Sequence, residues 1–297
     1  MRHPSSCGLL SENVIDARKF ASLDFSNGSF IMIGHFRKNV RQFLMWFCKK
    51  ILARYDFEVK KRETISIDVE AALTVRDSHL YSQWSPRGPR FCPWLGSPEF
   101  QKFYEGVENH TIVSPDRCYF LMAFANYATN LPGDFAECGV YKGGTALLLS
   151  RVMNSQGKTL HLFDSFKGLP KVGEQEEQWW QPGQFAIESV DSIKQLLQDF
   201  SHMIDIHPGW IPETFGGLEN CEFAFAHIDV DLYQSTLDCC EYFYPRMVPG
   251  GIFLFDEYGC PSALGEKDAV DKFLSDKPES AIVLPTGQAM FIKLPSV

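Results

Sequence analysis

The feature that most constrains the fold is a repeated alternation of apolar, strand-like runs and helix-compatible stretches from residue 111 onward. Strands are predicted at 134–140, 159–163, 203–207, 223–229 and 251–256, and helices at 117–130, 146–153, 190–200, 234–244 and 268–274. This alternation is typical of a parallel, doubly wound sheet with helices on both faces. Two further strands, 281–284 and 289–294, have only Gly287 and its neighbours between them. The predicted fold class is therefore α/β, with a mostly parallel seven-stranded sheet that ends in an antiparallel hairpin.

Charge and composition exclude several classes of protein. The 297 residues contain 28 Lys and Arg against 37 Asp and Glu, a formal net charge of −9, which disfavours a generally basic nucleic-acid binder. Hydrophobic residues make up 45% and charged residues 22%, as in a globular protein with a sizeable core and unlike a disordered chain.

The cysteines and the N-terminus predict the compartment. Nine cysteines occur without any C-x-x-C spacing, which disfavours a zinc site or a disulfide framework and favours reduced, mostly buried thiols. The segment Met1–Leu10 has no apolar stretch of signal-peptide length. We therefore expect a cytoplasmic protein.

The N-terminal third divides into two segments ahead of the α/β domain at 111–297. Residues 1–80 form an extension whose segment 36–62 carries a net charge of +7, from nine basic and two acidic residues. Apolar residues at helical spacing within 36–55 predict a basic amphipathic helix. Such a helix can contact an anionic membrane surface or an acidic partner, or it can pack on its own domain or on a second subunit. Residues 81–110 form an arm rich in proline and aromatic residues, either a linker or an ordered arm near a site or interface.

A glycine turn follows the first predicted strand, in the sequence E-C-G-V-Y-K-G-G. Glycines at such a turn let the backbone approach a ligand, and the carboxyl ends of the strands of an open α/β sheet form the ligand site. Glu137 opposes a pyrophosphate there and suits a cationic ligand such as a sulfonium. Asp164 ends the next strand and is placed to accept both hydroxyls of a ribose.

Four carboxylates end two neighbouring strands, in H-I-D-V-D-L-Y-Q and F-L-F-D-E-Y-G. Asp229, Asp231, Asp256 and Glu257 would repel one another at one sheet edge without a cation. Hard divalent cations prefer oxygen ligands, so magnesium is the natural candidate. The alternative is that these acids only face solvent.

The stretch from Thr111 to Leu294 resembles the macrocin O-methyltransferase family, the TylF, MycF and NovP group of sugar O-methyltransferases. The resemblance rests on T-I-V-S-P-D-R, D-F-A-E-C-G-V-Y-K-G-G, L-F-D-S-F-K-G-L-P, G-W-I-P-E-T, H-I-D-V-D-L-Y-Q-S-T and D-E-Y-G, in family order. It implies a Rossmann-like class I methyltransferase that uses S-adenosylmethionine and Mg²⁺. Residues 1–80 lie outside it.

The resemblance also implies roles for particular residues. The implied metal ligands are Asp229, Asp256 and Glu257, with Asp231 as general base. Glu257 departs from the family, which has Asp there, so its longer side chain is expected to shift the metal. The implied cofactor site comprises Thr111, Glu137, Cys138, Gly139, Val140, Tyr141, Gly143, Asp164, Ser165, Ser189 and Asp191.

Two further expectations concern the loop 167–185 and the strand histidines. The loop is broken by glycine and proline and predicts a mobile lid, with Trp179 and Trp180 facing a cation or a sugar ring, or else a plain surface loop. His161, His207 and His227 are expected to be packed strand residues rather than ligands.

The expected activity is Mg²⁺-dependent methylation of a sugar hydroxyl on a natural product or glycan, in a homo-oligomer. A metal-dependent glycosyltransferase could use D-V-D for a nucleotide sugar, a nicotinamide dehydrogenase could use the same sheet, and a silent cofactor-binding scaffold could keep the fold. Glu137 and the missing third fingerprint glycine oppose the dehydrogenase. The acceptor itself stays open, among macrolide, aminocoumarin, surface-glycan and lipid-linked sugars.

Overall fold

The computed structural model describes residues 81–82, 90–171, 180–187 and 189–295. Contacts divide the chain into two compact units, Met1–Ser66 and Ile67–Val297, and every described residue belongs to the second. The predicted extension 1–80, with its basic helix at 36–55, and Trp179 lie outside the described residues. Their predicted structure and contacts stay predictions.

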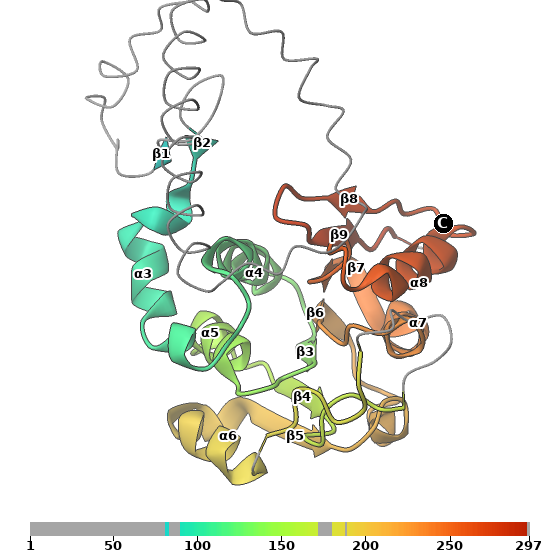
Figure 1. Cartoon of the computed structure of the whole chain (residues 1–297), viewed down its shortest axis with the longest axis horizontal. Helices are drawn as coiled ribbons and strands as arrows, with labels where there is room; N and C mark the ends of the chain where they lie inside the picture. Colours follow the sequence, from blue (N-terminus) through green and yellow to red (C-terminus); the bar gives the residue numbers. More distant parts are fainter. Residues whose placement is uncertain (1–80, 83–89, 172–179, 188, 296–297) are drawn as a thin grey trace, which may run out of the picture. The chain divides into compact units, whose positions relative to one another are not determined.

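Seven strands form one twisted sheet in the described domain (Figure 1). Their order is β5-β4-β3-β6-β7-β9-β8, parallel from β5 to β7, with β9 antiparallel to both β7 and β8. This confirms the predicted mostly parallel sheet with a terminal hairpin. The strands are β3 (Asp134–Cys138), β4 (Leu160–Asp164), β5 (Ile204–Pro208), β6 (Phe223–Ile228), β7 (Met247–Phe255), β8 (Ile282–Val283) and β9 (Ala289–Ile292).

The helices between the strands follow the predicted alternation with small changes at their ends. The predicted helix 190–200 ends early and continues as the 3-10 helix η5 (Gln198–Met203), and the predicted helix 268–274 begins one turn earlier. Ser114 and Pro115 start the helix Pro115–Ala128, as a helix-start pair predicts. The helices are α4 (Pro115–Ala128), α5 (Gly144–Met153), α6 (Val190–Leu196), α7 (Tyr233–Phe243) and α8 (Leu264–Leu274).

The sheet separates two apolar clusters, because neighbouring residues of a strand point to opposite faces. Phe135 and Phe225 pack with α4 and α5, whereas their neighbours Ala136 and Ala226 pack with α7 and α8. In Figure 1 these two helix pairs lie on opposite faces of the sheet. The strands are therefore buried on both faces, which explains their almost continuous apolar sequence.

The described part of the predicted arm packs on the α4 and α5 side. Ser97 accepts a hydrogen bond from the Phe100 N–H at 3.3 Å and caps α3, and Phe100 and Val107 are fully buried in the cluster of α4 and α5. These contacts make residues 92–110 part of the body of the domain. The arm's elements are β1 (Tyr81–Ser82), β2 (Arg90–Phe91), η3 (Pro93–Leu95), α3 (Pro98–Tyr104) and η4 (Val107–Asn109).

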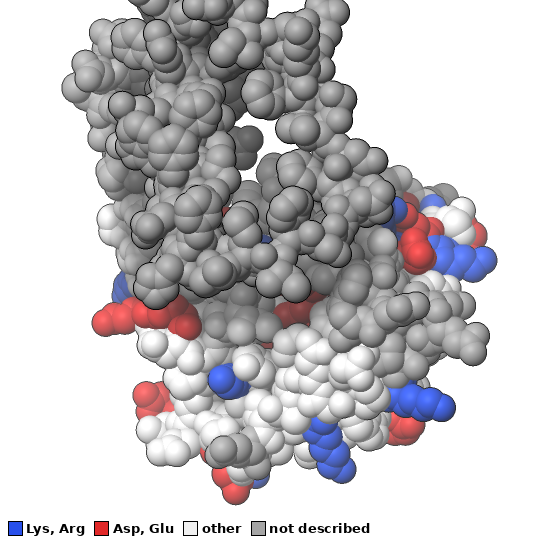
Figure 2. Space-filling view, viewed as in Figure 1, with Lys and Arg blue, Asp and Glu red and all other residues white. Residues whose placement is uncertain are grey.

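The described surface carries charges of both signs. In Figure 2 the lysine and arginine side chains of the described residues lie among acidic side chains and uncharged surface. Among the described helices, none is both long and apolar enough to cross a membrane.

Gly139 sets how closely β3 approaches β6 at the edge where both strands end. Its φ is +89°, and a Cβ on this residue would lie 1.8 Å from the carbonyl oxygen of Asp229. The Asp229 N–H donates to the Cys138 carbonyl at 2.8 Å across the same gap. Only glycine fits both the conformation and the space.

We predict that Gly139→Ala destabilises the domain by more than the strain of a left-handed alanine alone. Gly157→Ala is the matched control, because Gly157 also has a positive φ of +66° but no atom within 4 Å of its Cβ position. The control should cost about 1–2 kcal/mol, and Gly139→Ala clearly more, measured by urea unfolding of the whole chain. Equal losses for the two variants would contradict the account of the close approach.

Candidate active site

A cavity of about 320 Å³ opens where the parallel strands end. Its walls come from the segments that follow five neighbouring strands: 139–141 after β3, 164–165 after β4, 209–211 after β5, 229–231 after β6, and Glu257 after β7. This edge is where open α/β sheets hold their ligands. The sequence places the candidate site at this edge, and the cavity lies there.

Six of the predicted cofactor residues line this cavity. They are Thr111, Gly139, Val140, Tyr141, Asp164 and Ser165. Asp164 organises the glycine turn, because its Oδ2 accepts the N–H groups of Val140 and Tyr141 at 2.7 and 2.9 Å. Its Oδ1 accepts the Phe166 N–H at 2.7 Å. The carboxylate therefore ties the end of β4 to the turn after β3.

The other five predicted cofactor residues do not line the cavity. Cys138 is fully buried in the cluster on the α7 side, and Gly143 caps α5 beside Ile193 and Leu196. Ser189 caps α6 through the Asp191 N–H, while the Asp191 side chain is exposed and pairs with Lys194 at 3.3 Å. The fifth, Glu137, is fully buried in the sheet. These five residues are therefore close to the cavity-lining segments in sequence, but their side chains do not line the cavity.

Glu137 has a buried partner in the neighbouring strand. Its Oε1 lies 3.0 Å from Nδ1 of His227, and the other ring nitrogen lies 3.6 Å from Oδ1 of Asp256. Burial alone would lower the pKa of His227, but the neighbouring carboxylates of Asp256 and Glu137 raise it to about 10. The imidazolium is thus a buried cation between two buried carboxylates. His227 is a packed strand residue, as predicted, with an electrostatic role that the sequence did not indicate.

The predicted metal ligands come together. Asp229, Asp256 and Glu257 each offer one oxygen, and these oxygens lie within 4.8 Å of one another. Burial and the charges of Asp256 and Asp231 raise the pKa of Asp229 well above its ordinary value. Glu257 reaches the cluster despite being longer than the expected aspartate. Three carboxylates at this spacing can hold a hard divalent cation.

Arg117 contacts two of these three carboxylates. Its Nη1 lies 2.6 Å from Oδ2 of Asp256 and 2.5 Å from Oε1 of Glu257, and its side chain is 19% exposed. Burial alone would lower the pKa of Arg117, but the charge of Asp256 and the hydrogen bond with Glu257 raise it above its ordinary value. The guanidinium therefore neutralises part of the cluster where a metal cation would also bind.

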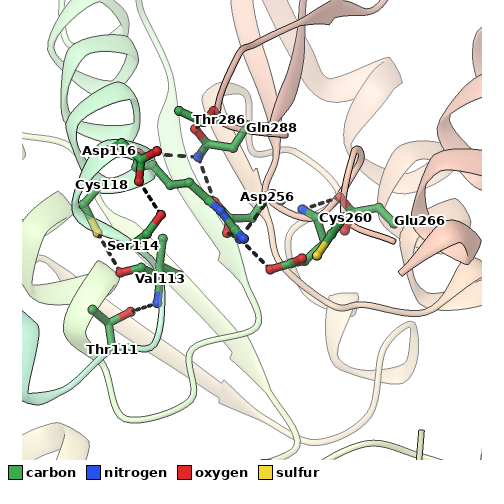
Figure 3. Close-up of polar contacts among 12 residues, drawn as sticks. Thr111, Val113, Ser114, Asp116, Cys118, Asp256, Cys260, Glu266, Thr286 and Gln288 are labelled. Atoms are coloured by element: carbon green, nitrogen blue, oxygen red, sulfur yellow. Dashed lines mark hydrogen bonds and ion pairs between the residues drawn. The ribbon is translucent and has the colours of Figure 1, made fainter. Parts of the chain in front are cut away.

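Two further residues hold the cluster in place (Figure 3). Nε2 of Gln288, from the terminal hairpin, donates to Oδ1 of Asp256 at 2.7 Å, and the two side chains point toward each other in Figure 3. Glu266, from α8, accepts the Glu257 N–H at 2.8 Å, and burial together with nearby carboxylates raises its pKa well above the ordinary value. Sequence reasoning missed Arg117, Glu266 and Gln288 as site residues. Of these three residues, only Arg117 lies in a motif on which the family resemblance rests, at the end of T-I-V-S-P-D-R.

Asp231 lies in the cavity wall in an unusual backbone conformation. Its φ is +61°, and the Leu232 N–H donates to the Val230 carbonyl at 2.6 Å across it. Tyr141 and Phe185, two other cavity residues that are not glycine, also have positive φ values. Such strain costs about 1–3 kcal/mol per residue and concentrates at functional sites. The strained conformation of Asp231 therefore supports a functional role for the turn that carries it.

The described ends of the predicted lid also reach the cavity. Leu169 and Phe185 line it, as does Trp180, which is only 8% exposed. The two ends are joined by backbone hydrogen bonds between Leu169 and Gln184 and between Gly183 and Leu169. The middle of the loop, 172–179, lies outside the described residues, so its mobility stays a prediction.

Two solved methyltransferase structures share this fold. The O-methyltransferase NovP matches with a TM-score of 0.54 and 24% identity, over 63% of this chain and 83% of NovP. The calicheamicin methyltransferase CalS11 matches with a TM-score of 0.53 and 20% identity, over 73% of this chain and 97% of CalS11. The domain therefore has the class I methyltransferase fold, as the resemblance implied.

Sequence comparisons identify the family. The model of the family macrocin-O-methyltransferase (TylF) matches residues 109–281, more than half of the chain, and the chain belongs to this family. A tetracenomycin-C 4′-O-methyltransferase of Streptomyces olivaceus is 28% identical over 49% of this chain and 59% of its own. Demethyldecarbamoylnovobiocin O-methyltransferase of Streptomyces niveus is 29% identical over 48% and 59%. The chain thus spans about three fifths of the length of these two relatives.

We predict that Arg117→Gln makes stability depend on divalent cations. Removing the guanidinium leaves the carboxylates of Asp256 and Glu257 uncompensated and should cost about 2–3 kcal/mol, less than for a fully buried pair. Mg²⁺ should then raise the unfolding temperature more in the variant than in the wild type, because it no longer competes with the guanidinium. Thermal unfolding with Mg²⁺ and with chelator measures this.

Arg246→Gln is the control for this experiment. Its guanidinium lies 4.0 Å from the Tyr242 ring, and Arg246 is not among the residues that line the cavity. The control should lose stability without changing the Mg²⁺ increment. An equal increment in Arg117→Gln and wild type would show that arginine and metal do not share this position.

Proposed function

We propose that this chain is an S-adenosylmethionine- and Mg²⁺-dependent O-methyltransferase that acts on a sugar hydroxyl. One observation carries the proposal: a single cavity is lined both by the glycine turn with Asp164 and by the acidic residues Asp229, Asp231 and Glu257. Methyl transfer to a hydroxyl needs a methyl donor and an activated oxygen in one water-poor space. This cavity would hold the methyl donor against the glycine turn and the activated oxygen against the acidic residues, side by side.

The cofactor half of the proposal rests on the turn around Gly139. Bound S-adenosylmethionine would supply an electrophilic methyl group on a sulfonium. Asp164 already accepts three N–H groups, and a carboxylate has about four acceptor positions. It therefore has room for one ribose hydroxyl, where the sequence predicted two. Trp210 and Ile211, which follow β5, add apolar wall to the same end of the cavity.

The buried position of Glu137 changes its proposed role. Its carboxylate faces His227 rather than the cavity, so it does not pair with the sulfonium in this proposal. Charge complementarity for the cation comes from Asp229 and Asp231 in the wall, and from the ring of Tyr141, which can contact a cation by its face. Glu137 instead fixes the charge of the histidine behind the metal ligands.

The acceptor half rests on the acidic cluster. Asp229, Asp256 and Glu257 would hold Mg²⁺, which supplies charge that lowers the pKa of a coordinated sugar hydroxyl. Asp231 lies in the same wall and would take the proton of that hydroxyl within hydrogen-bond reach. Arg117 would release Asp256 and Glu257 when the cation binds. His227 and Gln288 keep Asp256 oriented throughout.

The names of the relatives support a sugar as the acceptor. The Streptomyces olivaceus enzyme is named for the 4′-oxygen of a rhamnosyl tetracenomycin, and a relative from Micromonospora griseorubida, 26% identical over 55% of this chain and 70% of its own, for the 3′′-oxygen of mycinamicin III. Two vicinal hydroxyls would suit the proposed cation, since both can bind it. The predicted homo-oligomer and membrane contact stay predictions.

Asp231→Asn tests the proposed base. Asparagine keeps the size of the side chain but cannot take a proton, so methyl transfer to a vicinal-diol sugar should fall by about 10²–10⁴-fold. Affinity for S-adenosylhomocysteine, measured by calorimetry, should stay within about twofold of wild type, since this ligand lacks the sulfonium charge that Asp231 faces in the proposal.

Asp199→Asn serves as the control, because Asp199 is exposed in η5 and is not among the residues that line the cavity. It should keep both wild-type affinity and wild-type turnover. Turnover of Asp231→Asn at the wild-type rate would reject Asp231 as the base, and loss of cofactor affinity would place it in the cofactor wall instead.

A further inference from the structure

A second cluster of metal-binding side chains lies on the edge strands of the sheet. His161 is in β4, and Asp205 and His207 are in the edge strand β5. Parallel pairing places Asp205 opposite His161 and His207 opposite Phe163. These three residues are not among those that line the cavity, and the methyl-transfer proposal gives them no role.

The three donor atoms form a compact triangle. Nδ1 of His161 lies 3.1 Å from Nε2 of His207, and Oδ2 of Asp205 lies 3.6 Å and 3.3 Å from these two nitrogens. Tetrahedral coordination with metal–ligand bonds of about 2.0–2.1 Å separates neighbouring donor atoms by about 3.3 Å. The spacing of the triangle is therefore that of one face of a tetrahedral site.

A carboxylate stands behind the buried histidine. His161 is 4% exposed, and its second nitrogen, Nε2, has no hydrogen-bond partner but lies 3.6 Å from Oδ2 of Asp134. Asp134 is held in turn by the Thr159 N–H, which donates to its Oδ1 at 2.8 Å. A proton on Nε2 facing Asp134 leaves the lone pair of Nδ1 directed at the triangle. This carboxylate–histidine arrangement is the usual second shell of a metal-bound imidazole.

Solvent access to the triangle also suits a cation. The Asp205 side chain is 52% exposed, so solvent reaches the triangle and can supply a fourth ligand.

We propose that His161, Asp205 and His207 form a second divalent-cation site, of the kind that takes Zn²⁺, whereas the sequence led us to expect the two histidines to be packed strand residues rather than ligands. Two nitrogens and one oxygen suit a borderline metal such as zinc better than Mg²⁺, which prefers oxygen ligands alone. Without the metal, the two facing nitrogens share one proton in a hydrogen bond. On binding, that proton moves to Nδ1 of His207, and both rings turn so that their lone pairs meet at the ion.

The site would fasten the edge strand to the sheet. Among the described strands, β5 pairs only with β4, and Gly209 and Trp210 directly after it line the cavity. A cation bound by side chains of both strands would hold this wall without taking part in methyl transfer. Its presence or absence can therefore be tested independently of the proposed activity.

Calorimetric titration of Zn²⁺ into the full chain, with saturating Mg²⁺ to occupy the acidic cluster, tests the proposal. His207→Gln and Asp205→Asn should each bind one Zn²⁺ fewer per chain than wild type, or bind it at least about tenfold more weakly. His202→Gln is the matched control, because His202 is exposed in η5 just ahead of the same strand. It should bind Zn²⁺ as the wild type does.

Thermal unfolding supplies the second readout. Zn²⁺ should raise the unfolding temperature of wild type and His202→Gln but not that of His207→Gln. A cooperative unfolding transition of His207→Gln without metal checks that this variant is folded. Unchanged Zn²⁺ stoichiometry and affinity in His207→Gln would overturn the site. So would loss of binding in Cys221→Ser alone, which would place the ion on the other nitrogen of His161, with Asp134 and Cys221.

Discussion

Concentrated negative charge at the ends of β6 and β7 is the constraint on which the rest of the site depends. Asp229, Asp256 and Glu257 lie close together, and Asp231 is near enough to raise the pKa of Asp229. Carboxylates at this spacing repel one another unless cations neutralise them. The chain supplies two cations of its own, Arg117 from α4 and His227 from within β6.

These two cations act from different sides of the cluster. His227 is fully buried, lies between Glu137 and Asp256, and fixes the charge behind the metal ligands. Arg117 lies in the cavity wall, and its side chain is 19% exposed. The histidine therefore belongs to the buried frame of the site, whereas Arg117 contacts two of the carboxylates that would hold the proposed Mg²⁺. This division lets a strongly acidic cluster fold before any metal binds.

The sequence predicted the fold and the acidic cluster well, for a physical reason. Strand alternation and strand-end acids are local patterns, and parallel strands bring their carboxyl ends to one edge, so Asp229, Asp256 and Glu257 had to meet. Side-chain direction is not local. Glu137 and Cys138 precede the glycine turn by one or two residues, yet the pleat and the pairing with β6 turn them into the sheet. Arg117, Gln288 and the group around His161 come together only through tertiary packing.

The proposed function requires that one cavity takes a sulfonium cofactor beside a divalent cation. The most direct measurement is calorimetric titration of S-adenosylmethionine and S-adenosylhomocysteine into the full chain, with Mg²⁺ and with chelator, against NAD and UDP- and GDP-sugars. Only the first two ligands should bind. Failure of both to bind, together with metal-dependent binding of a nucleotide sugar, would contradict it and assign the D-V-D acids to a glycosyltransferase site.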